Sequence, residues 1–99
     1  RTDEAARRLG EALEIRRRAL PEDHWLIAVT ASALGACETA RGRFAEAERL
    51  LLDSYRTLAA QRGEANFRTR EAHQRLVELY DAWGQPERAA EYRATATSP

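Results

Sequence analysis

The 99-residue sequence contains no methionine, and its single cysteine is Cys37. One cysteine permits neither an intramolecular disulfide nor a cluster of thiolates around a metal, so we expect a reducing, cytoplasmic setting. No apolar run approaches the roughly 18 residues that a membrane-spanning helix needs, and no membrane partner is expected. Because a starting methionine is missing, we expect the sequence to be an internal or C-terminal part of a longer chain.

An excess of charge of either sign is also missing, because 16 basic residues balance 16 acidic ones. A neutral chain lacks the long-range attraction that draws basic domains to nucleic acid, so we expect no nucleic-acid partner. The one basic run, Arg16 to Arg18, falls near the end of a predicted helix, where cations are favoured. We interpret this run as a solvated helix end; contact with an anion or a nucleic acid is the alternative.

Motifs of catalysis and metal binding are missing as well, since the sequence holds no HExxH, paired CxxC, GxSxG or P-loop spacing. Cys37 lies among alanines and is interpreted as a packed thiol, with a nucleophile or redox sensor as the alternative. We interpret His24 as a turn residue rather than a ligand or pH switch. His73 is interpreted as a partly buried, hydrogen-bonded histidine rather than a metal ligand. The sequence therefore predicts no enzyme, no cofactor and no metal.

What the sequence does contain is a helical hairpin across residues 34–55. Two apolar faces with helical spacing flank Gly42, which can adopt the positive φ of a helix C-cap. The connection from Gly42 to Phe44 is so short that the two helices must run antiparallel in contact. The positions on these faces are Ile27, Ala31, Leu34 and Glu38 before the glycine, and Phe44, Ala47, Leu50, Leu51, Ser54, Tyr55 and Leu58 after it.

The hairpin pattern recurs after 42 residues, since this shift places Gly42 on Gly84 and, carried backward, Leu51 on Leu9. We expect one domain of about two and a half repeats. Units of this size cannot bury their faces alone, which favours membership of a longer array. The expected units are a half repeat at 1–20, a repeat at 21–62 and a C-terminal capping repeat at 63–99.

Five helices are expected, and each has a start or a stop signal. Thr2, Asp23 and Asn66 are expected to cap the first, second and fourth helices. Pro21 ends the first helix, and Pro86 suits the first position of the last one. The expected helices span residues 3–20, about 24–41, 44–62, 67–83 and 86–94, followed by a polar tail at 95–99.

The core is expected along one face of each helix. Gly35 should lie where two helices approach closely, because a side chain there would hold them apart. Aromatic residues at packing positions are also expected in the core; they are Trp25, Phe44, Tyr55, Tyr80 and Trp83. The buried stripe of the first helix is expected to be Ala5, Leu9, Ala12, Leu13 and Leu20.

The two hairpins resemble the tetratricopeptide repeat family, in the 42-residue variety found in kinesin light chains and many bacterial proteins. Leu34 and Gly35 match its Leu-Gly pair, residues 42–44 its Gly-x-Tyr/Phe turn, and residues 45–48 its Ala/Glu-rich helix opening. In the last unit, Val77 replaces the small residue and Pro86 the aromatic one, as fits a capping unit. The resemblance implies an all-α, right-handed α-solenoid of antiparallel hairpins that binds a protein or peptide.

A second, looser resemblance concerns the parent protein. Residues 69–72 and 76–84 are similar to C-terminal repeats that follow the catalytic domain in some bacterial serine/threonine protein kinases. All 16 basic residues are arginine, which suggests a codon bias toward GC and agrees with a bacterial source. These 99 residues hold no kinase motif, so any catalysis would belong to another part of the parent chain.

The family resemblance also implies which residues line the concave binding surface. They are Val29, Ser32, Ala36, Thr39 and Ala40 in one repeat, and Glu71, Gln74, Glu78, Asp81 and Ala82 in the next. The first set is small and nearly neutral, whereas the three carboxylates of the second are only partly offset by Arg75. We therefore expect a partner with small or apolar side chains over the first set and basic ones over the second.

Self-association, or structural capping of a longer array, is the alternative function. The first helix lacks the helix that precedes it in the family pattern, which leaves some of Leu9, Leu13 and Ile15 without cover. Exposed apolar patches of this kind tend to find partners. Under this alternative, we expect a homo-oligomer that forms through the N-terminal helix.

Overall fold

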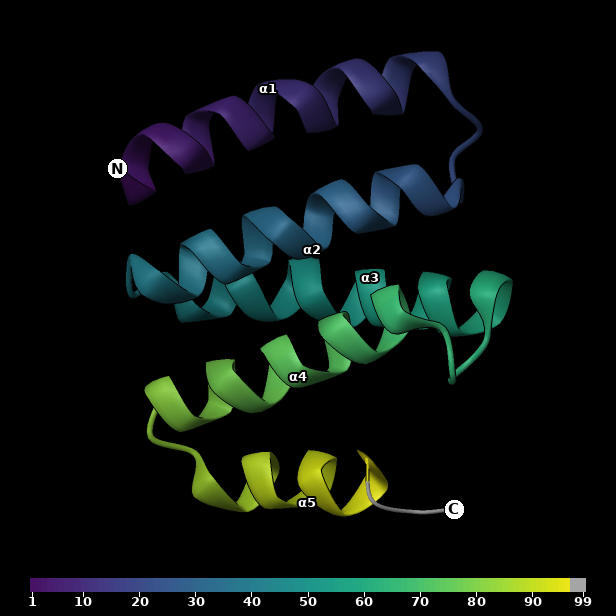
Figure 1. Ribbon diagram of the computed structural model, residues 1–99. Coiled ribbons are helices and arrows are strands. Elements are labelled where there is room, and N and C mark those ends of the chain that lie inside the picture. The colour runs from purple at the N-terminus through teal and green to yellow at the C-terminus, as the bar shows by residue number, and fades with distance from the viewer. Residues whose placement is uncertain (97–99) are drawn as a thin grey trace.

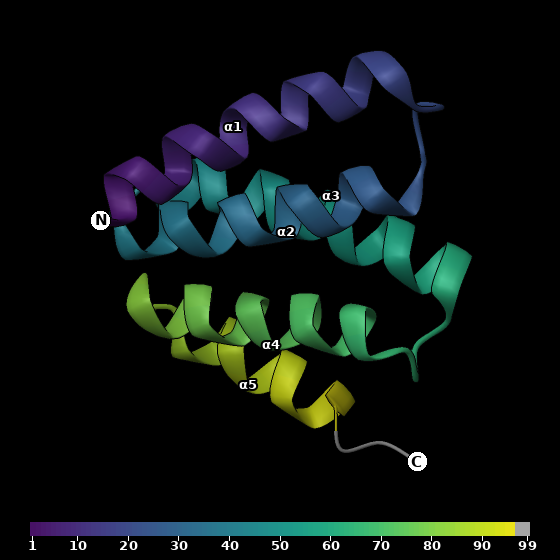
Figure 2. The same cartoon turned by 45° about the horizontal axis from the view of Figure 1, so that its top comes forward.

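The computed structural model describes residues 1–96 and confirms the all-α fold over them, with five helices and no strand. Each helix packs against the next one, and α2 also packs against α4 (Figure 1). In the tilted view, α3 lies behind α2 and α5 lies behind α4 (Figure 2). The right-handed winding stays a prediction. The helices are α1 (Thr2–Ala19), α2 (Trp25–Ala40), α3 (Phe44–Arg62), α4 (Phe67–Ala82) and α5 (Pro86–Ala96).

The two predicted hairpin turns are confirmed, and they have the same geometry. Gly42 and Gly84 adopt φ values of 77° and 75°, which an L side chain rarely tolerates. In each turn, the amide after the glycine donates across the helix end: Arg43 N to Glu38 O, and Gln85 N to Tyr80 O, both at 2.8 Å. We call α2–α3 the first hairpin and α4–α5 the second hairpin, and residues 42 apart equivalent.

The caps at the helix starts agree with the prediction in one case out of three. Asn66 caps α4 as expected, because its side chain accepts a hydrogen bond from Arg68 N at 2.9 Å. Asp23 was the wrong residue for α2: His24 takes that role, and its Nδ1 accepts from Leu26 N at 3.0 Å. Thr2 was also wrong, since it is the first residue of α1 and the cap position falls one residue earlier.

Several helix ends differ from the prediction by one or two residues. The first, second and fourth helices end at Ala19, Ala40 and Ala82, one residue early, because the following residue serves as the C-cap. Residues 44–62 form a helix as predicted. The last helix continues to Ala96 rather than stopping at residue 94, so it includes the start of the predicted polar tail. Residues 97–99 of that tail lie outside the described part of the chain.

The close approach predicted at Gly35 is confirmed. A Cβ built on Gly35 would lie 2.6 Å from Leu51 Cγ, which is far inside van der Waals contact. Leu51 itself is fully buried, in a cluster between α3 and the second hairpin. The absence of a side chain at position 35 therefore sets the distance between α2 and α3.

The core of the first hairpin continues into α1. Leu13 is buried against α2 and α3, in a cluster with Ile27, Ala31 and Leu50. The predicted stripe of α1 is otherwise only half-buried, and Ala6 rather than Ala5 is its second fully packed residue. The predicted stripe is therefore one position off at Ala5 and correct at Leu13, while Leu9, Ala12 and Leu20 are half-buried.

The predicted aromatic core is confirmed mainly around Tyr80, which is buried and stacks on Trp83 and Tyr92. Its hydroxyl donates to Glu48 Oε2 at 2.7 Å, and the same carboxylate accepts from Arg88 at 3.0 Å. Burial, and then the Glu48 hydrogen bond, raise the pKa of Tyr80. This contact joins α3 to both helices of the second hairpin. The other four predicted aromatics are half-buried against these clusters.

A charged residue also lies on an apolar face, as the sequence indicated for Glu38. Glu38 is buried, and its carboxylate accepts a hydrogen bond from Arg41 at 2.7 Å. Arg41 in turn pairs with Asp3 of α1 at 2.8 Å. The chain of charges explains how a carboxylate is tolerated here, since a buried charge needs a partner.

Over residues 1–96, no helix is both long and apolar enough to cross a membrane.

Candidate protein-binding face

The predicted binding residues form two rows on neighbouring helices. The α2 row consists of Val29, Ser32, Ala36 and Thr39, and the α4 row of Glu71, Gln74, Glu78 and Asp81. Because α2 packs on α4, the rows belong to adjacent helices on one side of the stack (Figure 1). Ala40 and Ala82, at the ends of the rows, are exposed.

The α2 row is largely covered by the rest of the fold. Ser32 is only 2% exposed, and its hydroxyl accepts a hydrogen bond from Arg75 of α4 at 2.9 Å. Val29 packs half-buried against the cluster that contains Ala28, Leu58 and Ala72. The Thr39 hydroxyl donates to the Gly35 carbonyl at 3.0 Å. Ala36 is half-buried. The polar groups of this row are therefore engaged within the protein, and what remains for a partner is a narrow, nearly neutral strip.

The α4 row is open. Gln74, Glu78 and Asp81 are exposed, and Glu71 is half-buried. Their spacing of three or four residues puts them on one side of the helix. The Gln74 amide donates to Glu78 at 3.4 Å, so these two side chains lie along the helix beside each other. Among the predicted residues, this row offers the largest accessible surface.

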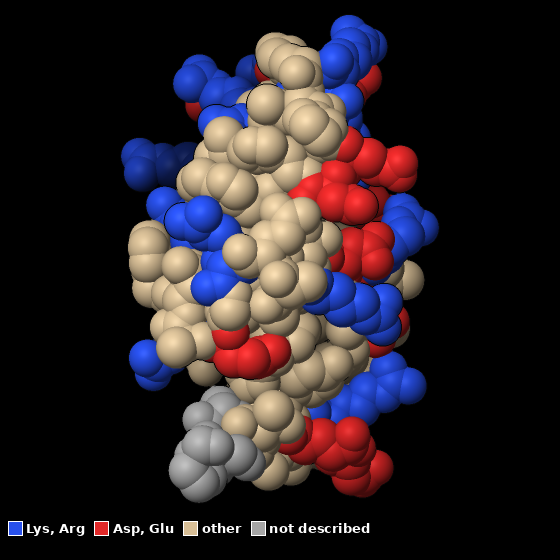
Figure 3. All heavy atoms as spheres, turned by 90° about the vertical axis from the view of Figure 1, so that its right-hand side faces the viewer, with Lys and Arg blue, Asp and Glu red and all other residues tan. Residues whose placement is uncertain are grey.

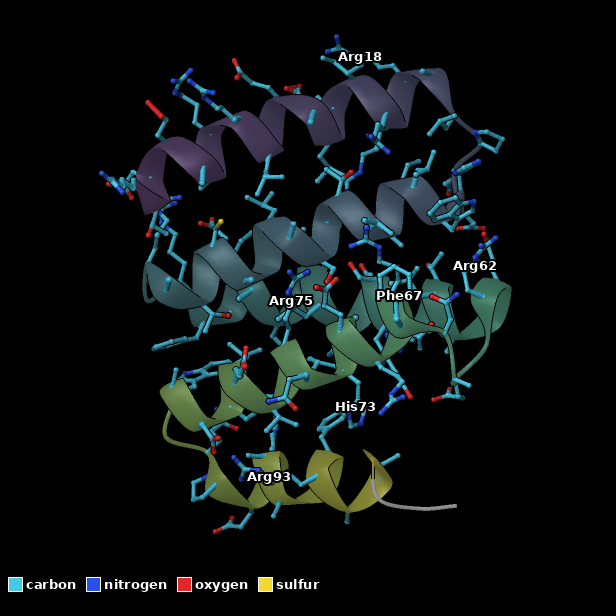
Figure 4. All side chains as sticks on the ribbon, in the orientation of Figure 1. Arg18, Arg62, Phe67, His73, Arg75 and Arg93 are labelled. Carbon is cyan, nitrogen blue, oxygen red and sulfur yellow. The ribbon has the colours of Figure 1, made fainter. Side chains whose placement is uncertain are left out.

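The charge of the α4 row is more strongly offset than the sequence indicated. Glu71 pairs with Arg68 at 3.3 Å and with Arg75 at 3.5 Å, and Asp81 pairs with Arg93 of α5. Figure 4 shows Arg75 between α2 and α4 and Arg93 reaching from α5 toward α4. Glu78 is the one carboxylate of the row without an ion pair among residues 1–96. The pairing of Arg68 with Glu71 could be predicted from their helical spacing. The pairing of Arg93 with Asp81 could not, because these residues lie on different helices that meet only in the folded chain.

The candidate reactive residues are placed as packing or capping groups. Cys37 is a free, half-buried thiol, and His24 is the N-cap of α2. His73 is 8% exposed between Tyr55 and Tyr92, with both ring centroids 5.5 Å away. Its Nε2 lacks a hydrogen-bond partner, so the predicted hydrogen bond is wrong at this atom. In the described part of the chain, no cluster of three or more His, Cys, Asp or Glu could hold a metal.

The titration of His73 follows from its packing. Burial lowers the pKa of its imidazole, and the nearby Glu64 carboxylate opposes this shift only in part. The neutral form is thus favoured in the folded protein. Tyr55, on one side of the ring, donates to Glu64 at 2.6 Å. Its burial, with this hydrogen bond, raises the pKa of Tyr55 to about 12.

A pocket that the sequence did not predict lies on the loop side of the second hairpin, and we call it the Phe67 pocket. It has a volume of about 740 Å³. The first hairpin has a smaller pocket of about 330 Å³, lined in part by the equivalent residues Glu22, Ile27 and Ala31. Figure 3 faces this side of the molecule and shows both charge signs around a broad uncharged area. Two residues of the α4 row, Glu71 and Gln74, also line the Phe67 pocket, so it adjoins the predicted binding residues. Its other lining residues are Tyr55, Glu64, Ala65, Phe67, Thr69, Arg70, His73 and Thr95.

Only part of the expected N-terminal patch is uncovered. Leu13 is buried by α2 and α3, and Leu9 is half-buried. Ile15 is 64% exposed, so it is the residue of the three that α2 leaves without cover.

The basic run Arg16 to Arg18 occupies the last turn of α1, as predicted. Arg18 pairs with Glu14 at 3.7 Å, and both side chains are exposed.

Comparison with known families supports one part of the resemblance. The family model described as tetratricopeptide repeat matches residues 1–26, which comprise α1, the loop that follows it and the first two residues of α2. The matched segment is not the one around Gly35 and Gly42 that carries the resemblance in the sequence. Neither curated proteins nor solved structures give a significant match to this chain. Residues 1–26 are thus similar to a tetratricopeptide repeat, and repeats of that family generally mediate protein–protein interactions and are typically non-catalytic.

Proposed function

We propose that the chain is a non-catalytic interaction module that binds a peptide segment or a protein partner across the α4 row and the adjoining strip of the α2 row. The observation that carries the proposal is the open line of Gln74, Glu78 and Asp81 on α4. The tetratricopeptide-repeat match of residues 1–26 supports the same class of function. The concave surface is the site that the family resemblance implies.

The ion pairs suggest which chemistry a partner would need. Glu78 has no ion pair among the described residues, so a basic side chain can pair with it without displacing an arginine. At Glu71 or Asp81, a partner's cation would compete with Arg75 or Arg93, which reduces its net contribution. Exposed pairs of this kind are worth under about 1 kcal/mol each. We therefore propose a partner with one basic residue opposite Glu78 and small side chains over Ala36.

A peptide library tests this proposal without knowledge of the natural partner. Peptides selected from a random displayed library against the wild-type chain would be measured against Glu78→Arg and against a matched control, Glu91→Arg. Glu91 is exposed on α5 and belongs to neither row. We expect the dissociation constant to rise about tenfold for Glu78→Arg, which corresponds to about 1.4 kcal/mol. Equal binding to both variants, or an equal loss in both, would contradict a site on the α4 row.

Self-association is a second candidate function, and the exposure of Ile15 favours it. Large apolar side chains that are 64% exposed on an otherwise charged helix are suited to contact another protein surface. Sedimentation velocity over a concentration series would test this function. A species that stays monomeric up to about 1 mM, the range of very weak binding, would contradict it.

We also propose that the parent protein is a bacterial serine/threonine kinase, or another cytoplasmic regulatory protein, with this segment as its interaction part. The support is the similarity of residues 69–72 and 76–84 to repeats that follow such catalytic domains. The coding sequence upstream provides the test. A kinase domain encoded there would agree with the proposal, and its absence would contradict the kinase assignment.

A further inference from the structure

The second hairpin has hydrogen-bonding residues where the first hairpin has an apolar cluster. The buried members of that cluster are Leu13, Ile27, Ala31 and Leu50. Their equivalents are Tyr55, Thr69, His73 and Tyr92. The imidazole of His73 packs between the two tyrosines, with each ring centroid 5.5 Å away, and it lies between α4 and α5 (Figure 4). Because the first hairpin packs without a polar group at these positions, helix packing does not explain the polar ones.

Two of these hydrogen-bonding groups have no partner among residues 1–96, namely Thr69 Oγ1 and His73 Nε2. Thr69 is 0% exposed and His73 is 8% exposed. Buried polar atoms in native proteins are nearly always hydrogen-bonded, because an unpaired one destabilises the fold. The two residues lie one turn apart on the same side of α4, and both line the Phe67 pocket. The pocket thus presents two unused hydrogen-bonding atoms to whatever occupies it.

A pocket also exists at the equivalent place of the first hairpin. It is lined by Ile27 and Ala31, the equivalents of Thr69 and His73. This pocket is present although α4 packs on α2 and although α3 continues to Arg62. The hollow is therefore a feature of the hairpin geometry. What distinguishes the second hairpin is the chemistry of the inner wall, which is apolar at the two positions in the first hairpin and polar in the second.

The inner wall of the Phe67 pocket favours an uncharged group. Burial lowers the pKa of His73 by more than the Glu64 carboxylate raises it, so a positive charge at this depth is disfavoured. A negative charge would be repelled by Glu64, whose field reaches His73, whereas Arg70 lines the pocket from an exposed position. Burying a charge also costs more than burying a neutral polar group. The group that fits beside Thr69 and His73 is therefore neutral and polar.

A primary carboxamide matches the two unpartnered atoms. Its nitrogen donates and its oxygen accepts, while the threonine hydroxyl and the neutral imidazole can each take the complementary role. The carboxamide nitrogen can thus donate to His73 Nε2 while its oxygen accepts from the Thr69 hydroxyl, and the two roles exchange if the imidazole has its other tautomer. Because donor and acceptor are on different atoms, the group can reach partners on successive turns of α4.

We propose that a peptide bound across the α4 row inserts an asparagine or glutamine side chain into the Phe67 pocket, where its carboxamide pairs with Thr69 and His73. The inference rests on the proposed function and adds a specificity-determining position to it. The pocket adjoins the row, since Gln74 belongs to both. Gln74 lies one turn from Glu78, and an extended peptide spans a turn of about 5.4 Å in about two residues. The carboxamide is therefore expected about two residues from the basic residue opposite Glu78.

Peptides selected from a random displayed library against the wild type test the inference through Thr69→Val. Valine has nearly the shape of threonine but lacks the hydroxyl. We expect the variant to unfold at the same temperature as the wild type or at a higher one, because an unpaired buried hydroxyl is removed. It should nevertheless bind the peptides about fivefold more weakly. Replacing the peptide's glutamine by methionine should weaken binding to the wild type and have little further effect on binding to Thr69→Val.

Thr30→Val is the matched control. Thr30 is also buried, but its hydroxyl donates to the Leu26 carbonyl at 3.0 Å within α2. We therefore expect this variant to be less stable than the wild type and to bind the peptides equally well. An equal loss of binding in Thr30→Val and Thr69→Val would assign both losses to the fold and would overturn the inference.

Two further outcomes separate this inference from the proposed function. Selected peptides that depend on Glu78 but lack asparagine and glutamine, or that bind Thr69→Val as they bind the wild type, would overturn the carboxamide site alone. Such a result would leave water as the occupant of the pocket. A wild-type chain that selects no peptide would overturn the proposed function and this inference with it.

Discussion

The two hairpins share one backbone plan and differ in what covers them. Both have a polar N-cap that accepts from the amide two residues later, and both turn at a glycine with nearly the same φ. In the first hairpin, α1 and α4 pack on either side, and its inward polar group, Ser32, is used by Arg75. In the second, the equivalent Gln74 is exposed. The comparison teaches that the helices packed against each hairpin, rather than its helical pattern, determine which of the equivalent residues are exposed.

The largest expected effect compares equivalent leucines. Leu76 is fully buried, whereas Leu34 is half-buried at the edge of its cluster. We expect Leu76→Ala to lower the free energy of unfolding by about 3 to 4 kcal/mol and Leu34→Ala by about half as much, because a cavity forms only at the first site. Urea denaturation would measure both values. A Leu34→Ala variant that costs as much as Leu76→Ala would show that the two hairpins are covered equally.

An intermediate effect is expected at Gly35, whose equivalent in the second hairpin is the buried Val77. Gly35→Leu should cost about 1 to 3 kcal/mol of unfolding free energy, because the new side chain overlaps Leu51. Combining it with Leu51→Ala should recover part of the loss, since space opens at the contact. If the double variant were simply as unstable as the sum of its two changes, Leu51 would not be the residue that limits position 35.

The smallest expected effect is the pH dependence of stability that is due to His73. The equivalent residue in the first hairpin is Ala31, which does not titrate. Burial lowers the pKa of His73 in the folded chain, so the unfolded chain binds a proton first as the pH falls. The stabilising contribution is complete above about pH 6.5, the usual pKa of unfolded histidine, and declines as the pH falls through the lower folded value. Thermal unfolding of the wild type and His73→Phe between neutral and mildly acidic pH would measure it. A wild-type profile that parallels that of His73→Phe would contradict the assignment.

The fold was accessible from the sequence because its signals are local. Gly42, Gly84 and Asn66 mark turns and caps through their own backbone preferences, and the structure places them as expected. The wrong choice of Asp23 as the cap of α2 could also have been avoided from the sequence. Shifting Asn66 back by 42 residues points to His24, which is the observed cap. The repeat pattern therefore carried more information on this helix start than the usual preference for aspartate.

The candidate site was less accessible because it depends on pairs of residues from different helices. Nothing near Asp81 in the sequence indicates that Arg93 neutralises it, and nothing near Ser32 indicates that Arg75 binds its hydroxyl. The Phe67 pocket is lined by residues of α3, the loop before α4, α4 and α5, and the apolar pattern of any one helix does not show that they come together. Sequence reasoning identified which residues share a helix face, but it could not determine which of them the fold leaves free.

Arg75 also has a mechanical consequence. It holds Glu71 on its own helix at 3.5 Å while donating to Ser32 on α2 at 2.9 Å, so one guanidinium links the charge state of the α4 surface to the spacing of two successive hairpins. In a longer array, that spacing determines curvature and bending stiffness. A partner whose cation displaced Arg75 from Glu71 would change the forces at the α2–α4 junction as well. Ligand occupancy and the elasticity of the array would then be thermodynamically linked, each altering the other by the same free energy.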